Sequence, residues 1–477
     1  MESLYSWGDG NGSEVTQEET KDEPVQLKRE IGLFSAVNMI LAVMIGSGIF
    51  VSPASALRYS GSVGLCIVIW AVCGIVSLLG ALAYAELGAL VPRSGSEYAY
   101  FMHSFGSLHK FWGRLPSFLY AWMSIIIIRP AEVAVIILTF SKYLCQPILN
   151  ALYIEDTEAI GKVTKAGALV GLGNTEHLSR GFEGTTNSPK DIALAFYSGL
   201  WAYDGWSAVT SVTEEIKRPE VNIPRSIIIA VPLVTSLYVF MNIAYMTVLT
   251  ADEMISSEAV AVTFGERVLG SFSYVIPIGV ALSTFGCALA LQFGVTRLCY
   301  VSGQDGLMLE SLSYVHHKRL TPMPAVVLQG IGSMLFIVVG DVATLIEFAS
   351  FLLWLFYGLA MVSLIVLRKT MKDVHRPFKV PIVIPIFILL VALYLSAVPI
   401  IMEPSLKYLV ALGFLLVGVL VYYWFVYKGK RPDAIMDRLT YFLQVLFAVV
   451  PVEGPEKKSK NVESTKKPDI PQRNTDM

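Results

Sequence analysis

Apolar stretches as long as a membrane-spanning helix constrain the fold of this chain most. A helix needs about 20 mostly apolar residues to cross the hydrocarbon core of a bilayer. Ten stretches of the 477-residue chain meet this requirement: 33–58, 63–91, 117–141, 191–216, 225–249, 272–300, 323–340, 344–367, 382–401 and 406–427. Charged residues make up only 16% of the chain, against roughly 25% in soluble domains. We therefore expect an all-α polytopic membrane protein.

The polar segments suggest how the chain is divided. We expect disordered tails at 1–30 and 453–477, which are polar throughout, and a transmembrane domain at 31–428. An amphipathic helix at the membrane surface is expected within 429–452. The mixed, polar segment 142–190 breaks the rhythm of the spans and is interpreted as an external loop or the scar of missing spans.

Lysines and arginines alternate between the two sides of the predicted spans. Basic residues follow spans four, six, eight and ten, whereas the loops between them carry few. This pattern predicts that both termini are cytoplasmic. The net charge of −2 gives no reason to expect a nucleic-acid partner.

The first span contains Met44, Ile45, Gly46, Ser47 and Gly48 near its centre. Two glycines and a serine weaken a helix there. A break at mid-depth is tolerated where the freed backbone lines a cavity, and its N–H groups suit a carboxylate. The alternative interpretation is close helix packing by small residues.

The fourth span contains Trp201, Ala202, Tyr203, Asp204 and Gly205. An aspartate at membrane depth costs roughly 2.5–3.5 kcal/mol on insertion scales, so we expect it to face a wet cavity or a cation. A structural aspartate bonded to free backbone N–H groups is the alternative. The two aromatic residues fit packing or gating as well as ligand contact.

Two interrupted helices together predict a transporter site. One break supplies N–H donors for a carboxylate, and the other, with Asp204, suits an ammonium group. A carboxylate and an ammonium group are the two charged groups of an amino acid, so we expect an amino acid substrate.

The third span carries Arg129, Pro130 and Glu132. Spacing of three residues allows a local ion pair beside a proline kink, and the alternative places Arg129 on the substrate path. We find no cluster of histidine, carboxylate or nucleophile for catalysis, no metal-ligand spacing and no nucleotide motif. We therefore expect a non-enzymatic protein without a cofactor or metal.

At these residues the chain resembles the light subunits of heteromeric amino acid transporters, within the amino acid–polyamine–organocation superfamily. Four of the matching stretches are IGSGIFVSP (45–53), LAFYSGLWAYDGW (194–206), TEEIKRPEVNIPRSI (213–227) and HRPFKVPIVIP (375–385). The resemblance covers most of the chain and lies nearest the b(0,+)-type branch. It implies a LeuT-like fold of inverted repeats with broken helices.

The resemblance also implies a function: sodium-independent exchange of cationic amino acids and cystine for neutral ones, at a plasma membrane, with the apical membrane as one candidate. The 44–48 segment would line the substrate site, with Ser47 and Gly48 holding the α-carboxylate. Asp204, where neutral and cystine/glutamate relatives carry a small uncharged residue, would contact a substrate ammonium. Arg129 aligns with a basic residue in the b(0,+) branch.

The chain departs from this family between Pro147 and Gly173, where two of the twelve family spans are missing. We therefore expect reduced or absent transport. The cysteine that relatives use for a disulfide to a glycoprotein heavy subunit is also missing, so covalent pairing is not expected, while non-covalent pairing stays open. Two further hypotheses are a neutral amino acid exchanger with a structural Asp204, and a truncated, transport-deficient chain that acts only by binding partners.

Overall fold

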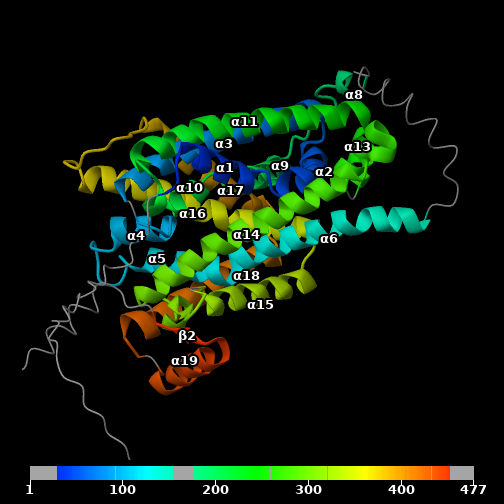
Figure 1. Ribbon diagram of the computed structural model, residues 1–477. Coiled ribbons are helices and arrows are strands. Elements are labelled where there is room, and N and C mark those ends of the chain that lie inside the picture. Colours follow the sequence, from blue (N-terminus) through cyan, green and yellow to red (C-terminus); the bar gives the residue numbers. More distant parts are fainter. Residues whose placement is uncertain are drawn as a thin grey trace, which may run out of the picture. The chain divides into compact units, whose positions relative to one another are not determined.

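The regular structure of the described residues is almost entirely helical (Figure 1). The computed structural model describes residues 30–451 apart from 92, 154–175, 258, 320, 403 and 431. The predicted tails, except Glu30, and the middle of the 142–190 segment thus lie outside the described residues. The all-α membrane fold predicted from the apolar stretches is confirmed.

The first predicted span consists of two helices. α1 (Leu33–Met44) ends before Ile45, α2 (Gly48–Ser60) begins three residues later, and the two are bent by 48°. Glycine and serine at the junction explain the break, since neither favours a helix interior. The predicted interruption of this span is confirmed.

The fourth predicted span is interrupted as well. α9 (Pro189–Ala202) is capped at its start by Ser188, whose side chain accepts a hydrogen bond from the Asp191 N–H at 3.3 Å. It ends shortly before Gly205, whose φ of +106° suits glycine better than any L side chain. The chain continues as turns and then as the short α10 (Ala208–Ser211).

Seven helices among the described residues are long and apolar enough to cross a membrane, and the bent pair α1–α2 makes an eighth. The seven are α3 (Val63–Leu90), α5 (Leu115–Met123) continuing through the π-helical η1 (Ser124–Ile128) into α6 (Arg129–Tyr153), α11 (Pro219–Val248), α14 (Val275–Gln304), α16 (Val342–Thr370), α17 (Val383–Met402), and α18 (Leu406–Val421) with η5 (Tyr422–Tyr427). The other two predicted spans are α9 with α10, and the shorter apolar helix α15 (Met323–Val339).

The third span differs from its prediction in two ways. Its π-helical turn η1 lies directly before Arg129 and Pro130, and such turns accommodate a residue that cannot donate its backbone N–H. α6 also continues to Tyr153. The segment predicted to be a loop from residue 142 therefore begins as helix.

The remaining elements are short and join the long helices. They are α4 (Glu97–Phe105), α8 (Glu176–Ser179), η2 (Thr213–Glu215), α12 (Ala251–Ser256), α13 (Val260–Leu269), η3 (Gly270–Phe272), η4 (Glu310–Ser313), α19 (Asp433–Phe447) and the strands β1 (Val315–His316) and β2 (Val449–Val450). β1 and β2 pair antiparallel, with Val315 opposite Val450. α19 lies within the 429–452 segment where the sequence predicts an amphipathic helix.

Large apolar side chains on the outer sides of the long helices are exposed. Leu282 of α14 is 68% exposed and Val338 of α15 is 85% exposed. In a soluble protein such faces would be an aggregation hazard. In a membrane protein they are the surfaces that lipid tails cover, so they fit the polytopic assignment.

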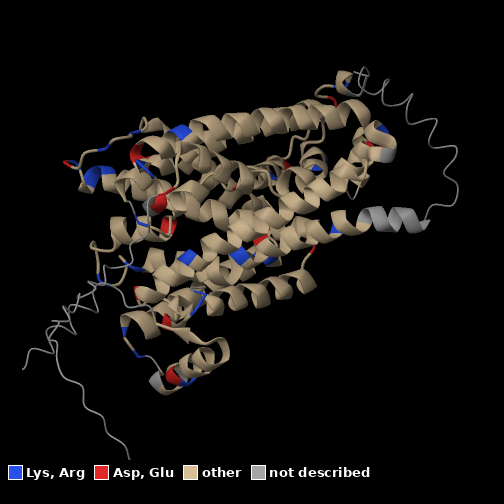
Figure 2. Ribbon diagram, in the orientation of Figure 1, with Lys and Arg blue, Asp and Glu red and all other residues tan. Residues whose placement is uncertain are grey.

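Charged residues gather toward the ends of the long helices (Figure 2). The buried Glu86 of α3 accepts hydrogen bonds from Arg368 Nε at 2.9 Å and Arg376 Nη1 at 3.1 Å. Arg93 pairs with Asp305 at 2.8 Å. The connections after α3, α14 and α16 thus meet at one end of the helices, as the alternation of basic loops predicts.

Candidate functional site

The two helix breaks are in direct contact. α2 packs against α9, and a Cβ atom added to Gly48 would lie 2.4 Å from the Cα of Ala202. A Cβ atom added to Gly205 would lie 2.4 Å from Cγ1 of Val43. Side chains cannot fit at these distances, so the glycines that weaken the helices also let the two breaks meet.

A tyrosine of α11 joins the ends of the two broken helices. The Tyr238 hydroxyl donates to the carbonyl oxygens of Met44 and Ala202, at 2.5 and 3.1 Å. These carbonyls belong to the last residues of α1 and α9. The partly negative ends of two helices therefore point to the same place.

A cavity of about 350 Å³ lies where the breaks meet. Six of the predicted binding residues line it: Met44, Gly46, Ser47, Gly48, Trp201 and Asp204. Glu132 and Ile136 of α6 and Cys287 and Leu291 of α14 complete the lining with Val43. The sequence prediction thus names both segments that form this cavity, although they lie about 150 residues apart in the chain.

Four predicted binding residues lie elsewhere. The backbone oxygen of Ile45 accepts a hydrogen bond from the Ser283 hydroxyl at 2.5 Å. Ala202 packs against Gly48, and the buried Tyr203 donates its hydroxyl to the Trp70 carbonyl at 3.0 Å. Gly205 lines the neighbouring cavity. Ile45, Ala202 and Tyr203 therefore line neither the cavity between the breaks nor the neighbouring one. They contact the residues that surround the site.

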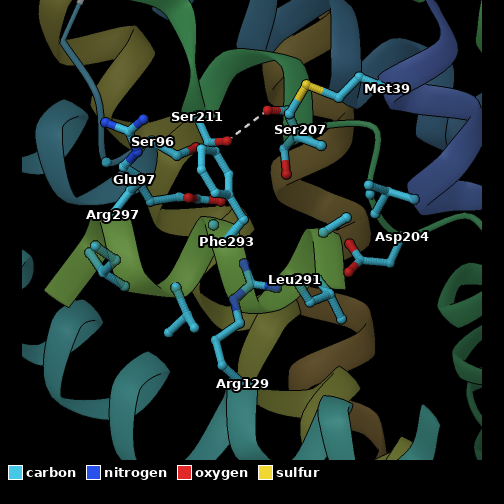
Figure 3. A pocket seen from close by; sticks show the side chains of 18 of the residues that line it. Met39, Ser96, Glu97, Arg129, Asp204, Ser207, Ser211, Leu291, Phe293 and Arg297 are labelled. Carbon is cyan, nitrogen blue, oxygen red and sulfur yellow. Dashed lines mark hydrogen bonds between the residues drawn. The ribbon is translucent and has the colours of Figure 1, made fainter. Parts of the chain in front are cut away.

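The neighbouring cavity is larger, about 740 Å³ with the open space at its mouth. Asp204, Val43 and Leu291 line both cavities, so the two adjoin. Figure 3 shows Arg129 and Asp204 reaching toward this cavity from either side of Leu291. The larger cavity extends to Arg297, whose Nη2 pairs with Glu215 at 2.8 Å.

Asp204 is held in place through one of its oxygens. Its Oδ1 accepts a hydrogen bond from the Tyr357 hydroxyl at 2.6 Å. Among the described residues, no hydrogen bond to Oδ2 is found. One oxygen therefore fixes the side chain, and the other can accept a hydrogen bond from a ligand cation.

Arg129 and Glu132 form the predicted ion pair. Nη1 of Arg129 lies 2.7 Å from Oε2 of Glu132, and Glu132 is only 2% exposed. The ion pair predicted from their spacing of three residues is therefore present, and each of the two charges lies beside an opposite charge. Arg129 also lines the larger cavity, and its place on a substrate path stays a prediction.

The geometry provides complementary ends for a zwitterion. The first turn of α2 has backbone N–H groups without partners inside the helix, and they carry partial positive charge beside Ser47. The carbonyl ends of α1 and α9 and the Asp204 carboxylate carry the opposite charge. A carboxylate fits the former and an ammonium the latter.

Several residues that form or support the site escaped the sequence analysis. Tyr357 donates a hydrogen bond to Asp204, 153 positions away, and Tyr238 donates one to Met44, 194 positions away. A local sequence pattern cannot show such distant contacts. α14 was predicted only as a span, yet it lines both cavities through Leu291.

Metal ligation has no support in the described part of the chain. No group of three or more His, Cys, Asp or Glu side chains is placed there to hold a metal ion.

Two interrupted membrane helices around a polar cavity define a secondary transporter of the broken-helix class. The amino acid permease family model matches the chain in two segments, residues 31–173 and 164–449. The segments overlap within the stretch where the sequence predicts missing spans. The chain belongs to the amino acid permease family.

Individual relatives agree with this assignment. The chain is 42% identical to the b(0,+)-type amino acid transporter 1 of Homo sapiens, over 90% of this chain and 94% of that protein. It is 38% identical to the cystine/glutamate transporter of Homo sapiens, over 94% and 97%. It is 37% identical to the large neutral amino acids transporter small subunit 2 of Mus musculus, over 90% and 88%. The chain is therefore similar to transporters of differently charged amino acids.

Proposed function

We propose that this protein exchanges amino acids across the plasma membrane without sodium, taking cationic amino acids and cystine against neutral ones. The observation that carries the proposal is the Asp204 carboxylate in a cavity formed by both helix breaks. Similarity to the b(0,+)-type transporter supports the same substrate class. The proposed activity is transport without covalent chemistry.

In the proposed binding mode, the α-carboxylate of the substrate contacts backbone N–H groups at Ser47 and Gly48. The α-ammonium faces the carbonyl ends of α1 and α9, which Tyr238 holds together. A cationic side chain then contacts Asp204. Neutral substrates use the first two contacts only, so both substrate classes fit one site.

Exchange follows if an occupied site is needed for the protein to change conformation. A ligand shifts an equilibrium between inward-open and outward-open states only by its differential affinity for them. Gly48 of α2 lies directly against Ala202 of α9, so residue 48 places no side chain between the two helices. We propose that substrate bridges the two breaks and so couples their movements.

The proposed location is a plasma membrane, with both termini in the cytoplasm and the apical membrane as one candidate. The shared end of the basic connections supports this orientation. A single-pass glycoprotein heavy subunit is a proposed, non-covalent partner. Cys145 is exposed and lies within α6, which continues to Tyr153.

An exchange assay in proteoliposomes tests the proposal. Purified wild-type protein should take up labelled arginine against internal leucine, and Asp204→Asn should lower arginine uptake by about tenfold or more, while leucine uptake continues. Tyr357→Phe is the matched control, because it removes the hydroxyl from Asp204 and keeps the carboxylate. Equal loss of both substrates in Asp204→Asn would contradict a cation-binding role.

That contradictory result would favour a neutral amino acid exchanger. The Tyr357–Asp204 hydrogen bond of 2.6 Å is the observation behind this second candidate, because it is also what a structural aspartate would make. A third candidate, a transport-deficient binding protein, rests on the missing two-span block. It predicts binding of arginine in solution but no exchange by the wild-type protein.

A further inference from the structure

Glu132 of α6 has a carboxylate oxygen that its ion pair leaves unused. Oε2 takes the hydrogen bond from Arg129 Nη1 at 2.7 Å. Oε1 is buried and has no hydrogen-bond partner among the described residues. The side chain is 98% buried, since only 2% is exposed. A buried carboxylate oxygen without a hydrogen-bond partner lowers the stability of the folded protein, so its presence needs an explanation. A hydrogen bond from a bound ligand would provide one.

The same side chain lines the cavity formed by the helix breaks. Glu132 faces that cavity together with Ser47, Gly48 and Asp204. It reaches the cavity from α6, whereas Asp204 comes from the segment after α9. The site therefore has two carboxylates on separate elements.

The charge around the breaks is unbalanced without a cationic ligand. Asp204 and Glu132 carry two negative charges, and Arg129 supplies one positive charge. Arg297 is paired with Glu215, whereas Glu97 accepts hydrogen bonds only from the neutral hydroxyls of Tyr84 and Tyr120 and is a third carboxylate, which lines the larger cavity. A zwitterion leaves this deficit unchanged, whereas a substrate with a further positive charge reduces it.

We propose that Glu132 is a second specificity residue, whose free Oε1 accepts a hydrogen bond from the distal cation of the substrate. The distal cation is the ammonium or guanidinium group of a dibasic amino acid. This inference rests on the proposed function and adds a contact to it. Arg129 then has two tasks, to hold Oε2 and to limit the negative charge of the site.

The competing interpretation makes Glu132 a counter-ion for Arg129 and nothing more. The two interpretations differ in three variants. Under our proposal, Glu132→Gln lowers the arginine-to-leucine affinity ratio, and so does the double variant Arg129→Gln/Glu132→Gln. Arg129→Gln raises that ratio, because Glu132 then has both oxygens available. A mere counter-ion would instead let the double variant recover the wild-type ratio.

The test measures binding of arginine and leucine to purified protein by thermal shift, together with exchange in proteoliposomes. We expect the arginine-to-leucine ratio to fall about tenfold in both Glu132 variants. The double variant keeps the test decisive if Glu132→Gln alone is unstable, since it leaves no unpaired buried ion. An unchanged ratio in the double variant overturns the proposal.

Failure of this inference is distinguishable from failure of the proposed function. If wild-type protein binds arginine in preference to leucine and the Glu132 variants do too, only the role of Glu132 is wrong. If wild-type protein binds leucine but not arginine, the cationic substrate class itself is wrong. If it binds arginine without exchanging it, the binding readout still decides the role of Glu132.

Discussion

At the scale of single residues, glycine determines how the two broken helices meet. Gly48 and Gly205 lie where a Cβ atom would come within 2.4 Å of a neighbour. Gly205 also has a φ of +106°. Its backbone conformation and its close contact both exclude a side chain, so these glycines do more than weaken a helix.

Replacement of Gly205 by alanine should therefore damage both stability and function. We expect a loss of about 1–3 kcal/mol in the free energy of unfolding, from backbone strain and the clash with Val43. Thermal unfolding in detergent measures it. Gly279→Ala in α14 is the matched control, because no atom lies within 4 Å of the added Cβ. If the two variants are equally stable, the close contact at Gly205 has no structural importance.

The sequence predicts residues of this site when the signal is local. Gly46, Gly48 and Asp204 stand out because two glycines one residue apart weaken a helix and a carboxylate is rare at membrane depth. Tyr357 does not, since a buried tyrosine in α16 looks like any core aromatic residue until its hydroxyl is seen on Asp204. Glu132 was identified as a partner of Arg129, and only the coordinates show that it also lines the cavity and has an unpaired, buried oxygen.

At the scale of secondary-structure elements, the apolar stretches predict helices better than they predict helix ends. Hydrophobicity reports the length of chain that lies in lipid, whereas a helix continues as long as its backbone bonds are satisfied. α6 runs to Tyr153, well past the predicted end of its span at 141. The end of α9 at Ala202, by contrast, follows from the nearby glycine and was anticipated.

The short helix α12 depends on a charged cap. Thr250 and Glu253 form a reciprocal capping box, and Arg267 of α13 donates to Glu253 Oε2 at 3.0 Å. This hydrogen bond from Arg267 lowers the pKa of Glu253 from its ordinary 4.5 to about 2. The ionised form is favoured in the folded state, so its stabilisation is complete above pH 4.5 and is lost as the pH falls toward 2.

We expect Glu253→Gln to lower the free energy of unfolding by about 0.5–1 kcal/mol at neutral pH, since the pair is partly exposed. The difference from wild type should shrink between pH 4.5 and 2, as Glu253 becomes protonated in the wild-type protein. Unfolding transitions of both proteins across this pH range check the prediction. A difference that grows with acidification would show that the sign is wrong.

At the scale of the whole molecule, ion pairs join distant connections at the end opposite to α12. Glu86 binds Arg368 and Arg376, and Arg93 binds Asp305. Removing one member of a buried ion pair leaves the other charge buried and uncompensated, which is strongly destabilising. The buried Glu86 and its two arginines therefore stabilise the contact between these connections. The alternation of basic residues predicted that these connections share one side, whereas the identity of the partners required the structure.

The central claim is that the two breaks form one cradle, with backbone N–H groups for a carboxylate and Asp204 for a cation. Binding isotherms of purified wild-type protein for arginine and for agmatine, which is arginine without its carboxylate, test it most directly. We predict that arginine binds about tenfold or more tightly, because only arginine can use the start of α2. Equal affinity for the two compounds, or binding of neither, would contradict the account.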